Sequence, residues 1–168
     1  MGLGRTVLEI SLETIDDWWE VEALFDLCFA PGREALSTYR MRDDVPPISD
    51  LCFVIRDGLG VLEGAVRFWE VYVGQYQALL LGPIAVHPTR QGEGLGGYMI
   101  KESLSSAKTL GWKRVMLIGD YKYYGRFGFR KLENVEMPPP INPKRVLGLA
   151  LFDGAWDSVY GKVSKKIF

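Results

Sequence analysis

The chain has 168 residues, of which 48% are apolar and 24% are charged, and its formal net charge is −1. This length and composition are those of an ordinary globular protein with a core of its own, so we expect one domain over residues 1–168. The balanced charge favours neither nucleic acid nor an anionic membrane surface as a partner.

Signals for export, membrane insertion and metal binding are weak. Met1 to Gly4 lead into a mixed segment without a signal-peptide pattern, and no apolar run approaches the roughly 20 residues that a membrane span requires. Cys28 and Cys52 stand in apolar surroundings, which is typical of buried thiols in a reducing compartment. With one histidine and no cysteine cluster, no metal site is expected. The expected location is therefore the cytoplasm.

The first third of the chain predicts a strand and then a helix. Val7 to Ile10 are expected to form a short first strand, and Thr14 is placed to begin a helix whose first turn carries two aspartates. Apolar residues then recur at helical spacing on more than a narrow face, so we expect a well-covered helix. The pair Trp18-Trp19 is expected in the core, with the alternative that one of them lines a substrate pocket.

Turn residues divide the next segment into a short helix and a meander of strands. Pro31-Gly32 ends the first helix, and the Asp57-Gly58-Leu59-Gly60 sequence predicts a tight turn. We expect the strands on either side of this turn to continue into the next one as an antiparallel meander. The predicted ranges are a helix over 33–42, a loop over 45–49, and strands over 51–55, 61–71 and 79–86.

The last of these strands is followed by an unusual loop. Leu79 to Val86 are apolar apart from Gly82-Pro83, a pair that indicates a bulge or a gap in the hydrogen-bond ladder. Four glycines then occur within residues 92–97, before a helix that Gly111 is placed to end. Strand, glycine loop and helix N-terminus together predict a site for a pyrophosphate, because backbone N–H groups converge there.

The rest of the chain predicts further strands around this unit. An apolar strand over 114–119 is expected to run parallel to the central strand, since a helix connects the two. Proline-rich residues 137–143 read as an extended spacer. The segments 146–152 and 159–168 are expected to be edge strands.

Two families use such a glycine loop. Residues 92–97 fit the dinucleotide pattern G-x-G-x-x-G, and Asp120 is placed at the end of the next strand, where an acid would bind ribose. This match lacks context, because a four-residue spacer separates the loop from its strand and about half of the chain comes first. A nicotinamide-dinucleotide-binding protein nevertheless remains an alternative.

The second reading starts from Gln91-x-x-Gly94-x-Gly96 preceded by Arg90, and from Tyr124-x-x-x-Gly128-Phe129 downstream. These motifs, in this order and after the strand Ile84 to Pro88, resemble the GCN5-related N-acetyltransferase (GNAT) superfamily, and most closely a bacterial subgroup of uncharacterised acetyltransferases. The resemblance implies a single α/β domain with a mixed, mostly antiparallel sheet that is splayed at the central strand and flanked by helices. It also implies transfer of an acetyl group from acetyl-CoA to an amine by direct attack in a ternary complex.

The resemblance also implies site residues. The N–H of Ile84 would face the acetyl carbonyl and Val86 the pantetheine arm, and Pro83, which has no N–H, would help to open the sheet. A preorganised N–H aimed at a developing oxyanion is worth about 3 kcal/mol in acyl transfer. The cofactor-binding residues implied are Ile84, Ala85, Val86, Arg90, Gln91, Gly92, Glu93, Gly94, Leu95, Gly96 and Gly97.

Tyr124 matches the tyrosine that many members use to protonate the departing thiolate, and its neighbour Tyr123 is the rival for this role. The general base stays open. The positions where some members carry a histidine or glutamate are Leu80, Leu81 and Gly82 here, which leaves His87, Glu70, Asp120 or a solvent relay. Asp120 is equally suited to cap a helix.

The missing base supports a second class of function, a non-catalytic acyl-CoA-binding or regulatory module. The acceptor, a small molecule or a peptide with an amine, is not identified by the sequence. The terminal strands offer edges at which a homodimer would form.

Overall fold

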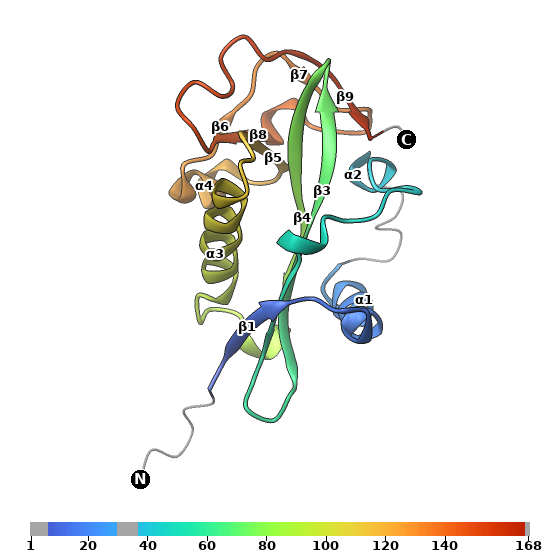
Figure 1. Cartoon of the computed structure of the whole chain (residues 1–168), viewed down its shortest axis with the longest axis vertical. Coiled ribbons are helices and arrows are strands. Elements are labelled where there is room, and N and C mark those ends of the chain that lie inside the picture. Colours follow the sequence, from blue (N-terminus) through green and yellow to red (C-terminus); the bar gives the residue numbers. More distant parts are fainter. Residues whose placement is uncertain (1–6, 30–36, 167–168) are drawn as a thin grey trace.

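The computed structural model describes residues 7–29 and 37–166, and Figure 1 shows a mixed sheet with helices on both sides. Hydrogen-bonded neighbours follow the order β1-β2-β3-β4-β5-β8-β6, while β9 joins β3 and β7 beside this path. The strands are β1 (Glu9–Leu12), β2 (Phe53–Arg56), β3 (Leu62–Val73), β4 (Tyr76–Val86), β5 (Arg114–Ile118), β6 (Arg130–Lys131), β7 (Val135–Glu136), β8 (Val146–Ala150) and β9 (Gly161–Lys165). The helices are α1 (Trp18–Cys28), α2 (Ser37–Arg40), α3 (Leu95–Thr109) and α4 (Tyr121–Tyr124). The predicted fold class is confirmed.

The long β3–β4 hairpin is the centre of the fold (Figure 1). Strands β2, β3 and β4 form the predicted antiparallel meander. Opposite Val66 and Phe68 of β3, the partners are Ile84 and Leu81, so β4 carries one extra residue at Gly82-Pro83. The predicted bulge is therefore present.

The sheet opens beyond this bulge. Strands β4 and β5 run parallel, as predicted, but they pair only at Leu79 with Val115 and at Leu80 with Met116. The second half of β4 therefore has a strand on one side and an opening on the other. Helix α3, which connects the two strands, begins at the far end of this opening.

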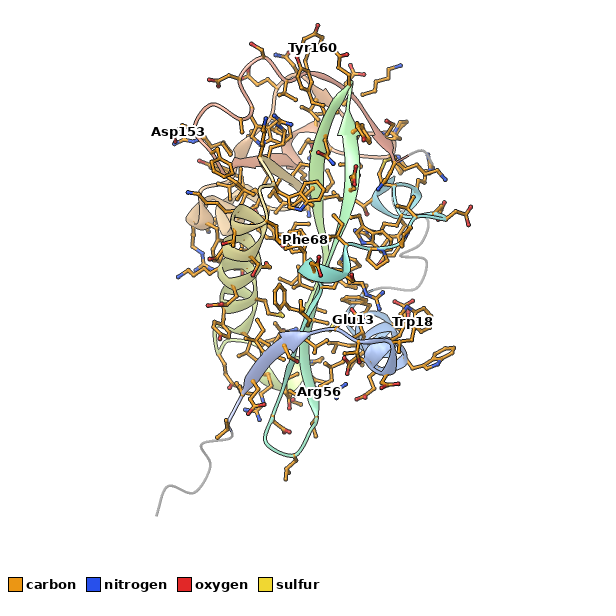
Figure 2. The ribbon with its side chains drawn as sticks, in the orientation of Figure 1. Glu13, Trp18, Arg56, Phe68, Asp153 and Tyr160 are labelled. Atoms are coloured by element: carbon orange, nitrogen blue, oxygen red, sulfur yellow. The ribbon has the colours of Figure 1, made fainter. Side chains whose placement is uncertain are left out.

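Helices cover the two faces of the sheet (Figure 1). Helix α3 buries Met99, Ile100 and Leu104 in a cluster with Phe68 and Leu117, and Figure 2 places Phe68 at the middle of the molecule. Full burial of one such side chain is worth about 1.5–3 kcal/mol. On the opposite face, α1 packs against β2, β3 and β4. Among the described residues, no helix is long and apolar enough to cross a membrane.

Helix α1 is less covered than predicted. It buries only one face, with Val21, Leu24 and Phe25 against the sheet. Trp18, labelled in Figure 2, is 39% exposed and Trp19 is 77% exposed, so the expectation of core tryptophans is wrong. The three buried positions lie at i, i+3 and i+4, and the remaining apolar residues fall outside this stripe.

Several predicted boundaries also differ. The first strand is Glu9–Leu12 rather than residues 7–10, and β2 begins two residues later than predicted, after a 3-10 turn at Ser49–Leu51. Helix α2 is Ser37–Arg40, while residues 33–36 and the Pro31-Gly32 break lie outside the described residues. Gly111 follows α3 with a φ of 92°, as expected of a residue that ends a helix.

The C-terminal strands are not the edges that the sequence predicts. Strand β8 lies between β5 and β6, because residues after α4 return to the sheet as the two-residue strand β6. Strand β9 pairs with the end of β3 on one side and with β7 on the other. Pairing partners this short carry no recognisable alternation in the sequence.

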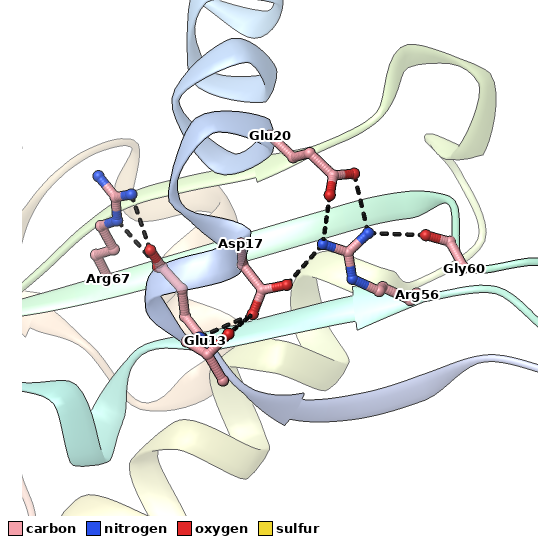
Figure 3. Close-up of polar contacts among 7 residues, drawn as sticks. Glu13, Asp17, Glu20, Arg56, Gly60 and Arg67 are labelled. Atoms are coloured by element: carbon pink, nitrogen blue, oxygen red, sulfur yellow. Dashed lines mark hydrogen bonds and ion pairs between the residues drawn. The ribbon is translucent and has the colours of Figure 1, made fainter.

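Two arginine networks fasten α1 and the turn before it to the sheet (Figure 3). Arg67 of β3, only 5% exposed, donates to Glu13 at 2.9 Å and 3.0 Å and to Glu22 at 2.7 Å. Arg56 of β2 donates to Asp17 at 2.7 Å and to Glu20 at 3.0 Å. Arg67 is buried and Arg56 is partly exposed, so the networks differ in solvent screening.

This difference predicts unequal costs. Arg67→Met should lower the free energy of unfolding by about 3 kcal/mol, because it leaves the buried Glu13 carboxylate without its counter-ion. Arg56→Met should cost about 1 kcal/mol or less, because solvent reaches Arg56 and its partner Glu20 and screens their interaction. Urea unfolding of both variants measures the two costs. Equal losses would show that burial of the Arg67 network does not determine its contribution.

Candidate active site

The glycine loop lies between β4 and α3. His87 ends the strand and caps the turn Pro88–Arg90, since its Nδ1 accepts from the N–H of Thr89 at 3.2 Å. Gly92 and Gly94 have φ values of 89° and 82°, and Gly94 is the N-cap of α3. A Cβ placed on either glycine would have no heavy atom within 4 Å. Both glycines therefore border open space in front of the N-terminus of a 15-residue helix.

The other two glycines allow close packing. A Cβ on Gly96 would lie 3.2 Å from the hydroxyl oxygen of Tyr123, and a Cβ on Gly97 would lie 3.2 Å from Cζ of Phe127. The lack of a Cβ at both glycines lets α4 and the turn after it lie against the start of α3. Gly92 and Gly94 thus allow the tight turn and leave space in front of it, whereas Gly96 and Gly97 allow Tyr123 and Phe127 to pack closely against the loop.

A cavity of about 470 Å³ lies over this loop. It is lined by Val86, Arg90, Gln91, Gly92, Gly94, Leu95, Gly96, Gly97, Tyr123 and Arg126. Most of the predicted cofactor-binding residues are thus brought together. Glu93 is not among them and instead pairs with Arg90, whose guanidinium also lies 3.4 Å from Glu63. Ala85 is buried against α1 on the other face of the sheet.

Sequence reasoning missed Arg126. Its guanidinium lies 4.6 Å from the centre of the Tyr123 ring, and it lines the loop cavity together with that ring. Arg126 comes from the turn Gly125–Phe127, inside the Tyr124-x-x-x-Gly128-Phe129 motif. The sequence feature that could have identified Arg126 is its position as a basic residue inside this motif, which the fold brings back to the glycine loop.

A second cavity, of about 490 Å³, occupies the opening between β4 and β5. Ile84 and Tyr124 both line it, whereas Tyr123 lines the loop cavity. The structure thereby separates the two tyrosines that the sequence left as rivals. The full lining is Phe29, Thr38, Tyr39, Arg42, Leu81, Gly82, Pro83, Ile84, Leu117, Ile118, Gly119, Tyr124, Ile141 and Arg145.

Strand register decides which backbone groups of β4 face this opening. The N–H of His87 donates to the carbonyl of Glu63 at 2.8 Å, so His87 is at a hydrogen-bonded position opposite β3. Antiparallel pairs alternate, which puts Val86 and Ile84 at the non-hydrogen-bonded positions with their N–H groups directed away from β3. Pairing with β5 has already stopped at Leu80. The N–H groups of Ile84 and Val86 therefore point into the opening.

Tyr124 is a protonated phenol held in an aromatic cluster. Burial, and secondarily the neighbouring Tyr123, raise its pKa to about 12, while Arg145 opposes the shift. Its ring packs edge-on against Tyr123 at 4.9 Å and Phe129 at 6.0 Å between ring centres. No described residue hydrogen-bonds its hydroxyl group. Tyr124 can therefore donate a hydrogen bond into the cavity throughout the physiological pH range.

The candidate bases lie elsewhere. Glu70 accepts from Gln77 at 3.0 Å and pairs with Lys166 at 3.2 Å, and Asp120 caps α4 by accepting from the N–H of Lys122 at 3.0 Å. His87 is engaged by Thr89. None of Glu70, Asp120 and His87 lines the cavity that contains Tyr124.

A sheet that opens beside a glycine loop, with a tyrosine facing the opening, is the arrangement of an acyl-CoA-dependent N-acetyltransferase. The model of the acetyltransferase (GNAT) family matches residues 16–129. The chain belongs to this family. The assignment decides between the two readings of the glycine loop in favour of the acetyltransferase.

Particular relatives point to one bacterial group. The chain is 32% identical over 111 residues to the uncharacterized N-acetyltransferase YhbS of Escherichia coli K12, an alignment that covers 65% of each chain, or just under two thirds of that relative's length. A crystal structure of E. coli YhbS in complex with CoA superposes with a TM-score of 0.83 at 26% identity, covering 97% of this chain and 92% of that one. A GNAT acetyltransferase from Brucella melitensis in complex with acetyl-CoA gives a TM-score of 0.71 at 25% identity, covering 95% and 96%.

Proposed function

We propose that the protein transfers the acetyl group of acetyl-CoA to an amine acceptor by direct attack in a ternary complex, with residues 1–168 acting as one N-acetyltransferase domain. The observation that carries this proposal is the joint placement of Ile84 and Tyr124 in one cavity, next to the glycine-loop cavity. The CoA and acetyl-CoA complexes of the similar structures support the choice of co-substrate. The free thiols of Cys28 and Cys52 fit a reducing compartment such as the cytoplasm.

The glycine loop would hold the pyrophosphate. Backbone N–H groups at the start of α3 and the partial positive charge of the helix N-terminus attract an anion, and the space at Gly92 and Gly94 admits it. Arg126 supplies a cationic side chain over this space. Arg90 contributes less, because Glu63 and Glu93 already neutralise it.

The opening in the sheet would hold the thioester. Val86 lines the loop cavity and Ile84 lines the adjoining one, so a pantetheine arm paired with β4 would bring the acetyl carbonyl to the N–H of Ile84. This N–H would stabilise the oxyanion that develops as the amine forms its bond to the carbonyl carbon, an effect of about 3 kcal/mol. When the carbon–sulfur bond breaks, Tyr124 would donate a hydrogen bond or its proton to the thiolate.

No carboxylate and no histidine lines this cavity among the described residues. We therefore propose that the amine attacks as its free base, and that solvent takes up the proton that the nitrogen loses once its bond to the carbonyl carbon has formed. The same observation favours the second candidate function, a non-catalytic acyl-CoA-binding module. Release of CoA from acetyl-CoA with a panel of amines decides between them, because only the enzyme turns the co-substrate over.

Cofactor choice gives the first binding prediction. Acetyl-CoA at 100 times its dissociation constant should raise the free energy of unfolding by about 2.7 kcal/mol, because it binds the folded chain alone. NAD and NADP should produce no comparable stabilisation. Thermal unfolding with each ligand measures this difference, and a shift with NAD but none with acetyl-CoA would contradict the proposal.

A further inference from the structure

Among the residues that the structure describes, the charged side chains lining the cavity that contains Ile84 and Tyr124 are all of one sign. Of the described residues that line it, Arg42 and Arg145 carry charge and no acidic residue is present. The remaining walls are mostly apolar or aromatic, including Phe29, Tyr39 and Ile141. A cavity of this kind attracts an anion and repels a cation.

Arg145 is held at the mouth of the opening by the backbone. Its carbonyl accepts from the N–H of Gly119 at 2.9 Å, and its own N–H donates to the carbonyl of Asn142 at 2.9 Å. These bonds fix the residue at the end of β5, beside Tyr124. The Arg145 side chain is exposed and has no ion-pair partner among the described residues. Its guanidinium is therefore available to a ligand.

Arg42 approaches from the opposite side of the cavity. It is 9% exposed, and its guanidinium carbon lies 4.3 Å from the centre of the Tyr39 ring. A Cβ built on Gly82 would lie 3.4 Å from its Nη2, which places the guanidinium at the β4 bulge, two residues before Ile84. Arg42, Gly82 and Ile84 line the same cavity. A group bound by Arg42 would therefore share this cavity with an amine at the acetyl carbonyl.

Among the described residues, the acidic side chains near Arg42 line the adjoining cavity. The adjoining cavity is lined by Trp18, Glu22, Asp43, Arg67 and Trp69, among others. Glu22 there accepts from Arg67 at 2.7 Å, and Asp43 is an exposed residue. These carboxylates do not line the cavity that contains Tyr124.

We infer that the acceptor is a small amine that also carries an oxyanion group, a carboxylate or a phosphate, which Arg42 and Arg145 bind while the amine reaches the acetyl carbonyl at Ile84. Guanidinium groups match both oxyanions geometrically, and a charge-assisted hydrogen bond in a partly desolvated site is strong. Polyamines and lysine-rich peptides are disfavoured by the same charges. This inference rests on the proposed acetyl transfer, which defines where the amine must lie.

Binding of product analogues tests the subsite without turnover. N-acetylated α-amino acids with apolar side chains are titrated by calorimetry into the protein saturated with CoA, and each is compared with its neutral carboxamide. N-acetylethanolamine phosphate is compared in the same way with neutral N-acetylethanolamine. We expect the acid or the phosphate to bind at least 10-fold more tightly than its neutral partner. If only the phosphate binds more tightly than its neutral partner, the oxyanion of the acceptor is a phosphate. If only the amino acids do so, it is a carboxylate.

Arginine variants assign the effect to the two side chains. Arg145→Gln should weaken binding of the anionic analogue about 10- to 100-fold and leave the neutral one unchanged, and Arg42→Gln should do the same if it folds. Arg40→Gln and Arg130→Gln remove exposed arginines that line neither cavity and should change nothing. Because Arg145 is exposed, its variant keeps the test valid even if Arg42→Gln is unstable.

Turnover of the matching amines separates the inference from the proposed function. Binding of anionic analogues without release of CoA from any amine would retain the subsite and reject acetyl transfer. Preferential turnover of carboxamides or cationic amines would retain acetyl transfer and overturn the subsite. Equal affinity for charged and neutral analogues, or no binding of any anionic analogue to the CoA complex, would also overturn it.

Discussion

Gly94→Val is expected to abolish measurable binding of acetyl-CoA, with the dissociation constant raised more than about 100-fold. The physical reason is steric, because a Cβ at Gly94 would enter the open space in which the pyrophosphate is proposed to lie. The variant also carries a conformational cost, since the φ of Gly94 is 82°. A side chain in that left-handed conformation costs roughly 1–2 kcal/mol. Calorimetric titration with acetyl-CoA measures the loss of affinity.

Gly60 offers a matched control for the backbone strain. Its φ is also 82°, and a Cβ there would also have no heavy atom within 4 Å, but it lies in the turn between β2 and β3 (Figure 3). Gly60→Val should therefore lose a similar amount of stability and keep its affinity for acetyl-CoA. If Gly94→Val is folded and binds as the parent does, the glycine loop is not the cofactor site. Equal loss of affinity in both variants would assign the effect to stability.

The central unit of the fold could be predicted because its signals are local. Gly82-Pro83 interrupts an apolar run, and the glycines after Gln91 mark a backbone that must turn tightly. The structure has a bulge at the first feature and positive φ values at Gly92 and Gly94. Each of these features depends on the conformational range of one or two residues, which the residue type itself specifies.

Features set by long-range pairing could not be predicted in the same way. The coverage of α1 depends on which sheet residues face it, so a helix rich in tryptophan was expected to be buried although Trp19 is exposed. The places of β8 and β9 depend on the two-residue strands β6 and β7, which have no sequence pattern of their own. The sequence leaves the general base open, because β4 carries Leu80, Leu81 and Gly82, and no acid or histidine among the described residues lines the cavity.

The charged residues of the site show the same limit. Arg42, Arg126 and Arg145 come from three separate loops or turns, and only Arg126 lies within a motif that the sequence singles out. The return of residues 121–127 to the start of α3 brings Arg126 to the site, and the return of the turn Pro143–Arg145 to the end of β5 brings Arg145 there. Tyr124 could be named because the motif Tyr124-x-x-x-Gly128-Phe129 resembles that of the family, and Gly128 of this motif has a φ of 95°.

Tyr124→Phe is expected to lower the rate of acetyl transfer by roughly 10- to 1,000-fold while the affinity for acetyl-CoA stays within a few fold. The variant removes only the hydroxyl group and keeps the ring that packs against Tyr123 and Phe129. The loss should belong to kcat, because the hydrogen bond from the hydroxyl strengthens as sulfur gains charge in the transition state. Steady-state kinetics with saturating acetyl-CoA measures this loss. Tyr121→Phe, on the same short helix but outside both cavities, is the matched control and should retain full activity.

The pKa of Tyr124, raised to about 12, determines how the parent and Tyr124→Phe differ in their dependence on pH. A phenol whose pKa is higher in the folded state than its value of about 10 in the unfolded chain stabilises the fold below pH 10, and this stabilisation is lost as the pH rises through 12. Parent and Tyr124→Phe should therefore melt alike at neutral pH, and only the parent should lose this contribution above pH 10. The alkaline limb of kcat that belongs to Tyr124 should likewise lie above pH 10, so the two rate profiles should run parallel between about pH 6 and 10.

A large drop in the melting temperature of Tyr124→Phe at pH 7 would identify the hydroxyl as a structural partner. A stable and fully active variant would transfer the role of acid to Tyr123 or to water.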